Sequence, residues 1–148
     1  MRSLRLPVLA APLLAPVLVM AAAAASLAQP ASPASPDSPD WSSPQTVEID
    51  LTNFAFAPAT LELKAGEVYR LHFVNKVSGG HDFTAKAFFS DATIDPDDQA
   101  AVKDGVVSLS GNQTADVRLM APKTGRYEAR CSHLMHATLG MKGEVVVQ

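Results

Sequence analysis

The chemically reactive residues of this sequence are concentrated in one short segment near the C-terminus. The segment runs from Cys131 to Met141 and contains the only cysteine, two of the four histidines and two of the five methionines. A more distant histidine, His81, directly follows a Gly-Gly pair. Two imidazoles, one thiolate and a weak axial thioether are the donors of mononuclear copper sites that transfer electrons. These residue types therefore predict one copper ion bound by the segment together with His81.

Other interpretations of the same residues explain less of the pattern. A lone cysteine is often a small buried hydrophobic residue, and a lone inward histidine is often a core residue. Both occur here beside further soft donors, and a free thiol outside the cytoplasm is a liability unless it is buried or ligated. Zinc shares the Cys and His ligands, but a thioether donor favours copper. The grouping therefore indicates a copper site.

The elements that must position these residues are expected to be β-strands. Between residues 46 and 148, apolar and polar residues alternate in short runs separated by turns, a pattern typical of an all-β sandwich or barrel. We expect about 7–8 strands, by the usual spacing of strands and turns. The clearest runs are Val47-Ile49-Leu51, Leu61-Leu63, Tyr69-Leu71-Phe73, Val117-Leu119 and Tyr127-Ala129-Cys131.

The alternation also predicts which way the scarce side chains point. His81 is in phase with Phe83, and Cys131 is in phase with Tyr127, so both are expected on apolar faces at strand ends. Asp82 would then face the opposite side. His72 falls on the polar face of its run and is expected to be exposed.

One segment interrupts the strand pattern, from residue 89 to residue 105. Asp95-Pro96 and the residues after it could begin a short helix, so we expect one short helix or irregular insertion there. The acidic residues of this segment are predicted to form a solvated face.

The N-terminal third has two parts with different compositions. Residues 1–28 contain two arginines, then an uncharged run, then small residues before Gln29. This order predicts a secretory signal peptide, and an uncleaved membrane anchor is the alternative. Without an Arg-Arg pair, export would follow the general secretory route. Residues 29–45 form a linker rich in Pro, Ser and Ala, and residues 46–148 form the folded domain. A periplasmic or secreted location follows, with membrane contact only if the leader stays attached.

The charge balance excludes a nucleic-acid binder. The chain has 12 basic and 15 acidic residues; removal of Arg2 and Arg5 with the leader leaves 10 against 15, or a net charge of −5. Proteins that bind nucleic acids need a basic surface to neutralise phosphates.

The motif around the cysteine resembles the cupredoxin family of small blue copper proteins. The likeness rests on Cys131-x4-His136-x4-Met141, a loop most similar to that of rusticyanin, and on the preceding Gly125-Arg-Tyr-Glu-Ala-Arg-Cys131. The resemblance implies a Greek-key sandwich in which His81, His136, Cys131 and the axial Met141 hold one type 1 copper ion. It also implies a one-electron carrier and no enzymatic activity. Many members have Asn after the first histidine, whereas this chain has Asp82.

Two rival ligands lie inside the same loop. His133 would leave seven residues before Met141, unlike the family's loops, so we interpret it as a neighbouring or surface group. Met135 is a weaker rival of Met141, which lies where the last strand is expected to begin.

The resemblance further implies transient contacts between redox partners and an apolar patch around His136. The candidate residues of this patch are Leu134, Met135, Ala137 and Leu139. We expect a monomer. Copper storage or delivery is the main alternative function, and a metal-free immunoglobulin-like binding module would leave the loop composition unexplained.

Overall fold

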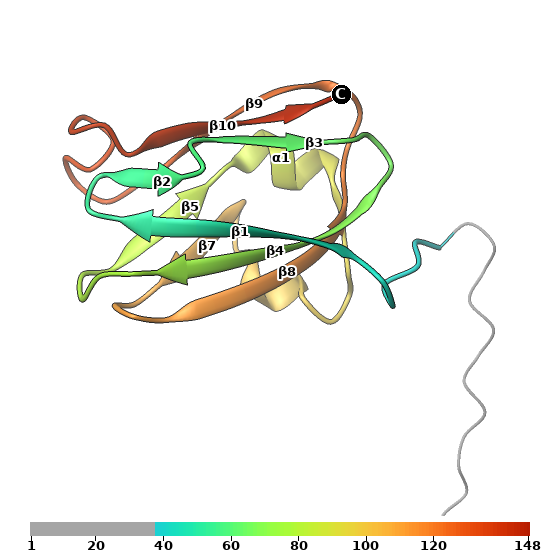
Figure 1. Cartoon of the computed structure of the whole chain (residues 1–148), viewed down its shortest axis with the longest axis horizontal. Helices are drawn as coiled ribbons and strands as arrows, with labels where there is room; N and C mark the ends of the chain where they lie inside the picture. Colours follow the sequence, from blue (N-terminus) through green and yellow to red (C-terminus); the bar gives the residue numbers. More distant parts are fainter. Residues whose placement is uncertain (1–37) are drawn as a thin grey trace, which may run out of the picture. The chain divides into compact units, whose positions relative to one another are not determined.

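Two five-stranded sheets make up the folded part of the chain in the computed structural model, which describes residues 38–148 (Figure 1). The first sheet has the order β2-β1-β4-β8-β6 and the second β3-β10-β9-β5-β7. The strands are β1 (Gln45–Thr52), β2 (Ala55–Ala57), β3 (Thr60–Leu63), β4 (Val68–Asn75), β5 (His81–Thr84), β6 (Thr93–Ile94), β7 (Val106–Leu109), β8 (Thr114–Met120), β9 (Gly125–Arg130) and β10 (Lys142–Val147). The predicted all-β sandwich is confirmed. The strand number exceeds the expected 7–8, and β2 and β6 are only three and two residues long.

The strand pairing joins segments that are distant in the sequence. β1 pairs in parallel with β4, and β3 pairs in parallel with β10, while the other pairs are antiparallel. The chain therefore passes repeatedly from one sheet to the other. β5 begins with His81, and β9 ends one residue before Cys131. These two strands lie next to each other in the second sheet.

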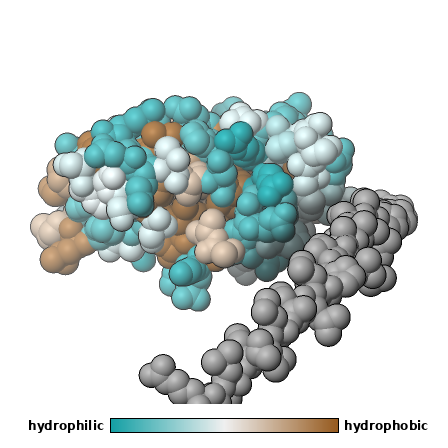
Figure 2. Space-filling view, turned by 90° about the horizontal axis from the view of Figure 1, so that it is seen from below, coloured by the Kyte–Doolittle hydropathy of each residue, from teal (hydrophilic) through white to brown (hydrophobic). Residues whose placement is uncertain are grey.

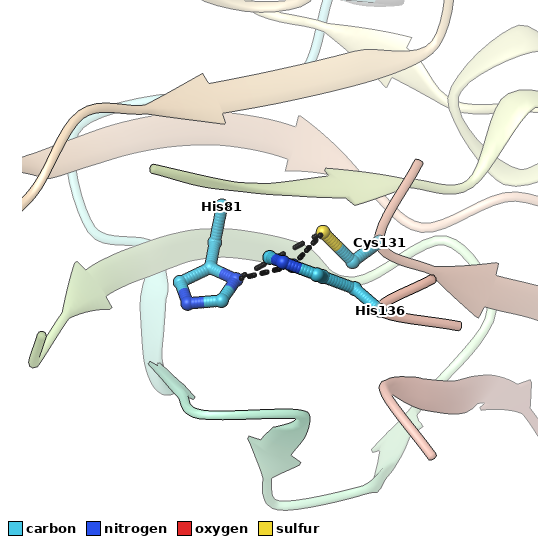
Figure 3. Close-up of side chains that lie close together, drawn as sticks. All are labelled: His81, Cys131 and His136. Carbon is cyan, nitrogen blue, oxygen red and sulfur yellow. Dashed lines mark hydrogen bonds between the residues drawn. The ribbon is translucent and has the colours of Figure 1, made fainter. Parts of the chain in front are cut away.

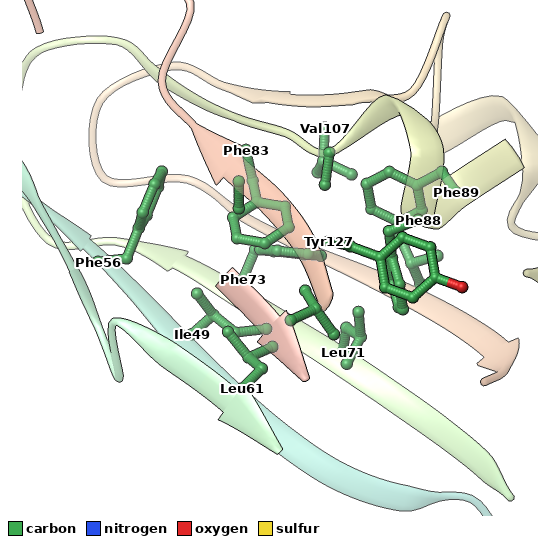
Figure 4. Packing of buried hydrophobic residues seen from close by; sticks show 14 of the residues in the cluster. Ile49, Phe56, Leu61, Leu71, Phe73, Phe83, Phe88, Phe89, Val107 and Tyr127 are labelled. Atoms are coloured by element: carbon green, nitrogen blue, oxygen red, sulfur yellow. The ribbon is translucent and has the colours of Figure 1, made fainter. Parts of the chain in front are cut away.

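The core fills the space between the inner faces of the two sheets (Figure 4). The predicted alternation is present: Ile49, Leu71 and Phe73 of the first sheet are fully buried, and Phe83 of the second sheet packs against Phe73 with ring centroids 5.2 Å apart. Burial of a large apolar side chain stabilises the fold by roughly 1.5–3 kcal/mol. The core thus supplies a rigid frame on which the strand ends are fixed.

The helix lies earlier in the chain than the sequence predicted. The α-helix α1 spans Lys86–Asp91, whereas the residues after Asp95-Pro96 form only a short 3-10 helix, Gln99–Ala101. The helix buries Phe88 and Phe89 in the core. Two adjacent buried phenylalanines give no clear helical period in so short a segment, so the pattern was not visible in the sequence.

Two acidic residues of the insertion, Asp95 and Asp98, do not lie on a solvated face but contact Arg118. Asp95 is buried, and its carboxylate lies 3.1 Å from the guanidinium of Arg118. Asp98 also accepts hydrogen bonds from the Arg118 backbone N–H at 2.9 Å and from Nε at 2.8 Å. The prediction was wrong for these two residues because their basic partner, Arg118, lies on β8, which is distant in the sequence.

The predicted leader and most of the predicted linker lie outside the described residues. The signal-peptide prediction for residues 1–28 therefore stays a prediction, as does the linker prediction for residues 29–37. Strand β1 begins at Gln45, one residue before the predicted domain boundary. Within residues 38–148, no helix is both long enough and apolar enough to cross a membrane.

Candidate metal centre

His81 is the first residue of β5, and the turn before it is held by a buried amide. The side chain of Asn75 is 2% exposed and donates hydrogen bonds to the carbonyl of Gly79 at 2.7 Å and that of Ser110 at 3.0 Å. These bonds join the β4–β5 turn to the β7–β8 turn. His81 itself is buried, at 3% exposure, as its phase with Phe83 predicted.

The segment from Cys131 to Met141 folds back on itself between β9 and β10. The backbone N–H of Cys131 donates to the carbonyl of Met141 at 3.1 Å, and the N–H of Met141 donates to the carbonyl of His136 at 2.9 Å. The N–H of His136 in turn donates to the carbonyl of His133 at 3.1 Å. These bonds close the loop, so residues five to ten positions apart meet at the end of the sandwich.

Three of the four predicted ligands converge on one point (Figure 3). The Nδ1 atoms of His81 and His136 lie 3.2 Å apart, and the Cys131 Sγ lies 3.9 Å from the first and 3.5 Å from the second. A metal about 2.0 Å from each nitrogen and about 2.3 Å from the sulfur would place such atoms roughly 3.3–3.7 Å apart. The three donor atoms therefore fit around a single ion with little movement, and the set of two nitrogens and one thiolate suits copper.

The other sulfur and imidazole groups of the loop occupy different positions. Met141 is fully buried and joined through its backbone to both Cys131 and His136, whereas Met135 is 56% exposed. The His133 side chain is 44% exposed, and its Nε2 lies 3.6 Å from a carboxylate oxygen of Asp82. Among the described residues, the only group of three or more Cys, His or acidic side chains placed to hold an ion includes His136 and omits His133.

Burial favours the neutral forms of two of the donors, His81 and Cys131. Burial, followed by the like charge of neighbouring His136 and His133, lowers the pKa of His81 below its usual value. Burial likewise raises the pKa of the Cys131 thiol. At neutral pH the imidazole of His81 is therefore available as a donor, whereas a metal must displace the thiol proton.

Asp82 joins β5 to the loop. Its carboxylate is almost fully buried and accepts hydrogen bonds from the Ser132 N–H at 2.8 Å, the Ser132 hydroxyl at 2.6 Å and the Thr84 hydroxyl at 2.8 Å. The sequence left the role of an acid at this position undecided. In the structure, the carboxylate connects the residue after His81 to the residue after Cys131 and so fixes both ligand-bearing segments.

Sequence reasoning missed Phe54, which lies in the turn between β1 and β2. Its ring packs edge to face against His136, with ring centroids 5.3 Å apart. In residues 38–148 the exposed large hydrophobic residues are Phe54, Leu134, Met135 and Leu139, and we call this set the apolar patch. Figure 2 shows hydrophobic groups at the end of the domain where the β9–β10 loop lies in Figure 1. Ala137, also predicted for this surface, is half-buried.

His72 is less exposed than the sequence suggested. Its side chain is 25% exposed and its Nδ1 lies 2.7 Å from a carboxylate oxygen of Asp116 on β8. The neighbouring strand supplies this acid, so the sequence of β4 alone could not indicate it.

Comparison with known proteins identifies related sequences and structures. The family pattern described as a cupredoxin-like domain matches residues 16–147. Auracyanin B is 25% identical, with a TM-score of 0.51 over 70% of this chain and 88% of the other. Auracyanin from Roseiflexus castenholzii (20% identity, TM-score 0.54, 70% and 97% coverage) and auracyanin A, a "blue" copper protein from Chloroflexus aurantiacus (22%, 0.52, 72% and 100%), share the fold. No curated protein matches the chain.

Proposed function

Because the chain belongs to the cupredoxin-like domain family, we propose that it is a mononuclear blue copper protein that carries single electrons between redox partners outside the cytoplasm. The observation that carries this proposal is the convergence of His81, Cys131 and His136 within 4.8 Å. Auracyanin A, described as a "blue" copper protein, has the same fold and adds support. The extracytoplasmic location rests on the predicted leader, and fractionation of cells expressing the full chain tests it.

The proposed ligands are His81 and His136 through Nδ1, Cys131 through Sγ and Met141 as the weak axial donor. A bound copper ion would supply a Cu(I)/Cu(II) couple. The chain's part is to hold the donors in nearly the same positions in both oxidation states, which keeps the reorganisation small. Hydrogen bonds across the loop and from the Ser132 N–H to the Asp82 carboxylate provide this rigidity. In this proposed ligand set, side chains fill all four donor positions and leave none for a substrate, so we propose no enzymatic activity.

The apolar patch is the proposed docking surface for redox partners. Leu134, Met135 and Leu139 lie on the loop that contains His136, and Phe54 packs against the ring of this histidine from the β1–β2 turn. A small apolar contact suits partners that must separate quickly after each electron transfer. We expect Leu139→Asp to slow electron self-exchange between reduced and oxidised copies at least tenfold while the copper spectrum stays the same. An unchanged self-exchange rate would mean that docking uses another face.

The proposal is tested by adding Cu(II) to the purified domain and recording the visible and EPR spectra, followed by a redox titration. We expect an intense blue thiolate-to-copper band and reversible one-electron cycling. Cys131→Ser removes the band, whereas His133→Ala, a matched change inside the same loop, leaves it in place.

Binding without colour or reversible cycling would overturn the electron-carrier proposal. That result would favour copper storage or delivery, in which the exposed His133 and Met135 could help to pass the ion on. Retention of both the band and the redox couple in Cys131→Ser would overturn the proposed ligand set.

A further inference from the structure

Phe54 is the exception among the phenylalanines of this protein. The other five are at most 5% exposed and belong to the core, whereas Phe54 is 40% exposed. An exposed aromatic ring gains little from the hydrophobic effect. Packing in the core therefore does not account for a phenylalanine at this position.

The backbone of Phe54 is also in an unfavourable conformation. Thr52 pairs with Ala55 across the β1–β2 hairpin, so Asn53 and Phe54 form a two-residue turn. Phe54 has a φ of 63°, in the left-handed region that bulky residues seldom adopt. Asn53 is not among the residues with positive φ, and a turn in which only the second central residue has positive φ favours glycine at that position. A phenylalanine here costs backbone strain that its partial burial offsets less well than burial in the core would.

What the ring does contact is a proposed copper ligand. The rings of Phe54 and His136 meet at an interplanar angle of 88°, with centroids 5.3 Å apart, a favoured edge-to-face arrangement. The turn also lies against the end of the ligand loop, because a Cβ atom added to Gly140 would be 3.7 Å from the Phe54 carbonyl oxygen. His136 is only half-buried and, unlike His81, does not lie on a strand. Its imidazole therefore has less support from the sheet than the other histidine of the cluster.

We propose that Phe54 is a positioning residue for His136: the strained turn holds the phenyl ring against the imidazole, restricts its rotation and keeps Nδ1 directed at Cys131. Strained residues persist where the surrounding structure holds them in place, and they are frequent at functional sites. The inference rests on the proposed function for its copper measurement. Its measurement on the metal-free protein is independent of that function.

Four variants distinguish the effect of the phenyl ring from the effect of the backbone strain. Phe54→Gly removes both the ring and the strain, because glycine adopts this positive φ without steric cost. Phe54→Ala removes the ring but keeps the strain, and Phe54→Tyr keeps both. Asp104→Ala is the matched control, because Asp104 is another exposed non-glycine residue with positive φ, at 53°, in the segment that follows the 3-10 helix. All four are studied as the full domain, and circular dichroism checks that each variant is folded.

The first measurement uses NMR on the metal-free protein. In Phe54→Gly we expect the side-chain signals of His136 to lose their ring-current shift and to show faster ring motion, while urea unfolding shows equal or greater stability than the wild type. If Phe54 did not position His136, relief of the strain would raise the stability and leave the motion of the His136 ring unchanged. Phe54→Tyr should behave like the wild type.

The second measurement follows loss of copper to a chelator in excess. We expect Phe54→Gly and Phe54→Ala to release copper at least tenfold faster than the wild type, with Phe54→Tyr and Asp104→Ala within twofold of it. If wild-type protein binds no copper, the proposed function fails. If it does bind, and Phe54→Gly matches the wild type in both His136 motion and copper release, the role of Phe54 is refuted.

Discussion

The connection between Asp82 and Ser132 gives the sharpest test of how the site is built. We consider Asp82→Ala, which removes an almost fully buried carboxylate that accepts three hydrogen bonds. Hydrogen bonds to a charged group each contribute about 1.5–3 kcal/mol, but burial of the charge costs several kcal/mol. We therefore expect the free energy of unfolding of the metal-free domain to fall by about 3 kcal/mol, because the change leaves three hydrogen-bond donors without their acceptor while it removes the cost of burying the charge.

Asp82→Asn provides the conservative comparison. Its amide oxygen can still accept from the Ser132 N–H and the Thr84 hydroxyl, while its NH2 group can donate to the Ser132 hydroxyl oxygen. The loss should then be only about 1 kcal/mol, that of an ordinary neutral hydrogen bond. Copper affinity should follow the same order and fall about 10–100-fold in Asp82→Ala, as is typical for groups that orient metal ligands.

Urea unfolding monitored by tryptophan fluorescence and circular dichroism measures the stability change. Asp116→Ala is the matched control. The Asp116 carboxylate also makes three polar contacts with side chains, two with Arg70 and one with His72, but the side chain is 43% exposed. Surface interactions of this kind are worth at most about 1 kcal/mol. If Asp82→Ala costs no more than Asp116→Ala, or if Asp82→Asn costs as much as Asp82→Ala, the connection does not hold the two segments together.

Three further predictions concern the frame around the site. The hydrogen bond from Arg118 lowers the pKa of Asp98. The stability that this interaction contributes is therefore present above the unfolded pKa near 4 and is lost as pH falls through the folded pKa. Asp98→Asn should cost about 1–2 kcal/mol at pH 7 and progressively less below about pH 4, as measured by urea unfolding. Asn75→Ala leaves buried carbonyls without a donor, so it should cost about 2–3 kcal/mol and weaken copper binding by displacing His81; unchanged copper affinity would count against this. Gly111→Ala would force a Cβ into a neighbouring serine carbonyl, and thermal unfolding should show a loss of about 1–3 kcal/mol.

The sequence by itself predicted the class of fold, which is confirmed, and the copper chemistry that we propose for the site. Alternation is a local property of the chain, because successive side chains of a strand point to opposite faces. It correctly placed Phe73 and Phe83 in the core and put His81 and Cys131 on inward faces. The soft donors of the loop indicated copper because ligand preference follows from atom type, which needs no coordinates.

Only the tertiary structure decided which groups meet. The Nδ1 of His81 lies 3.9 Å from a sulfur fifty residues away because β5 and β9 pair in one sheet, and no local pattern specifies that pairing. The same holds for Asp82 with Ser132 and for Phe54 with His136. Strand register and loop closure are set by the packing of the whole core, so the contacts that hold the ligands in place could not be derived from the spacing of the residues that make them.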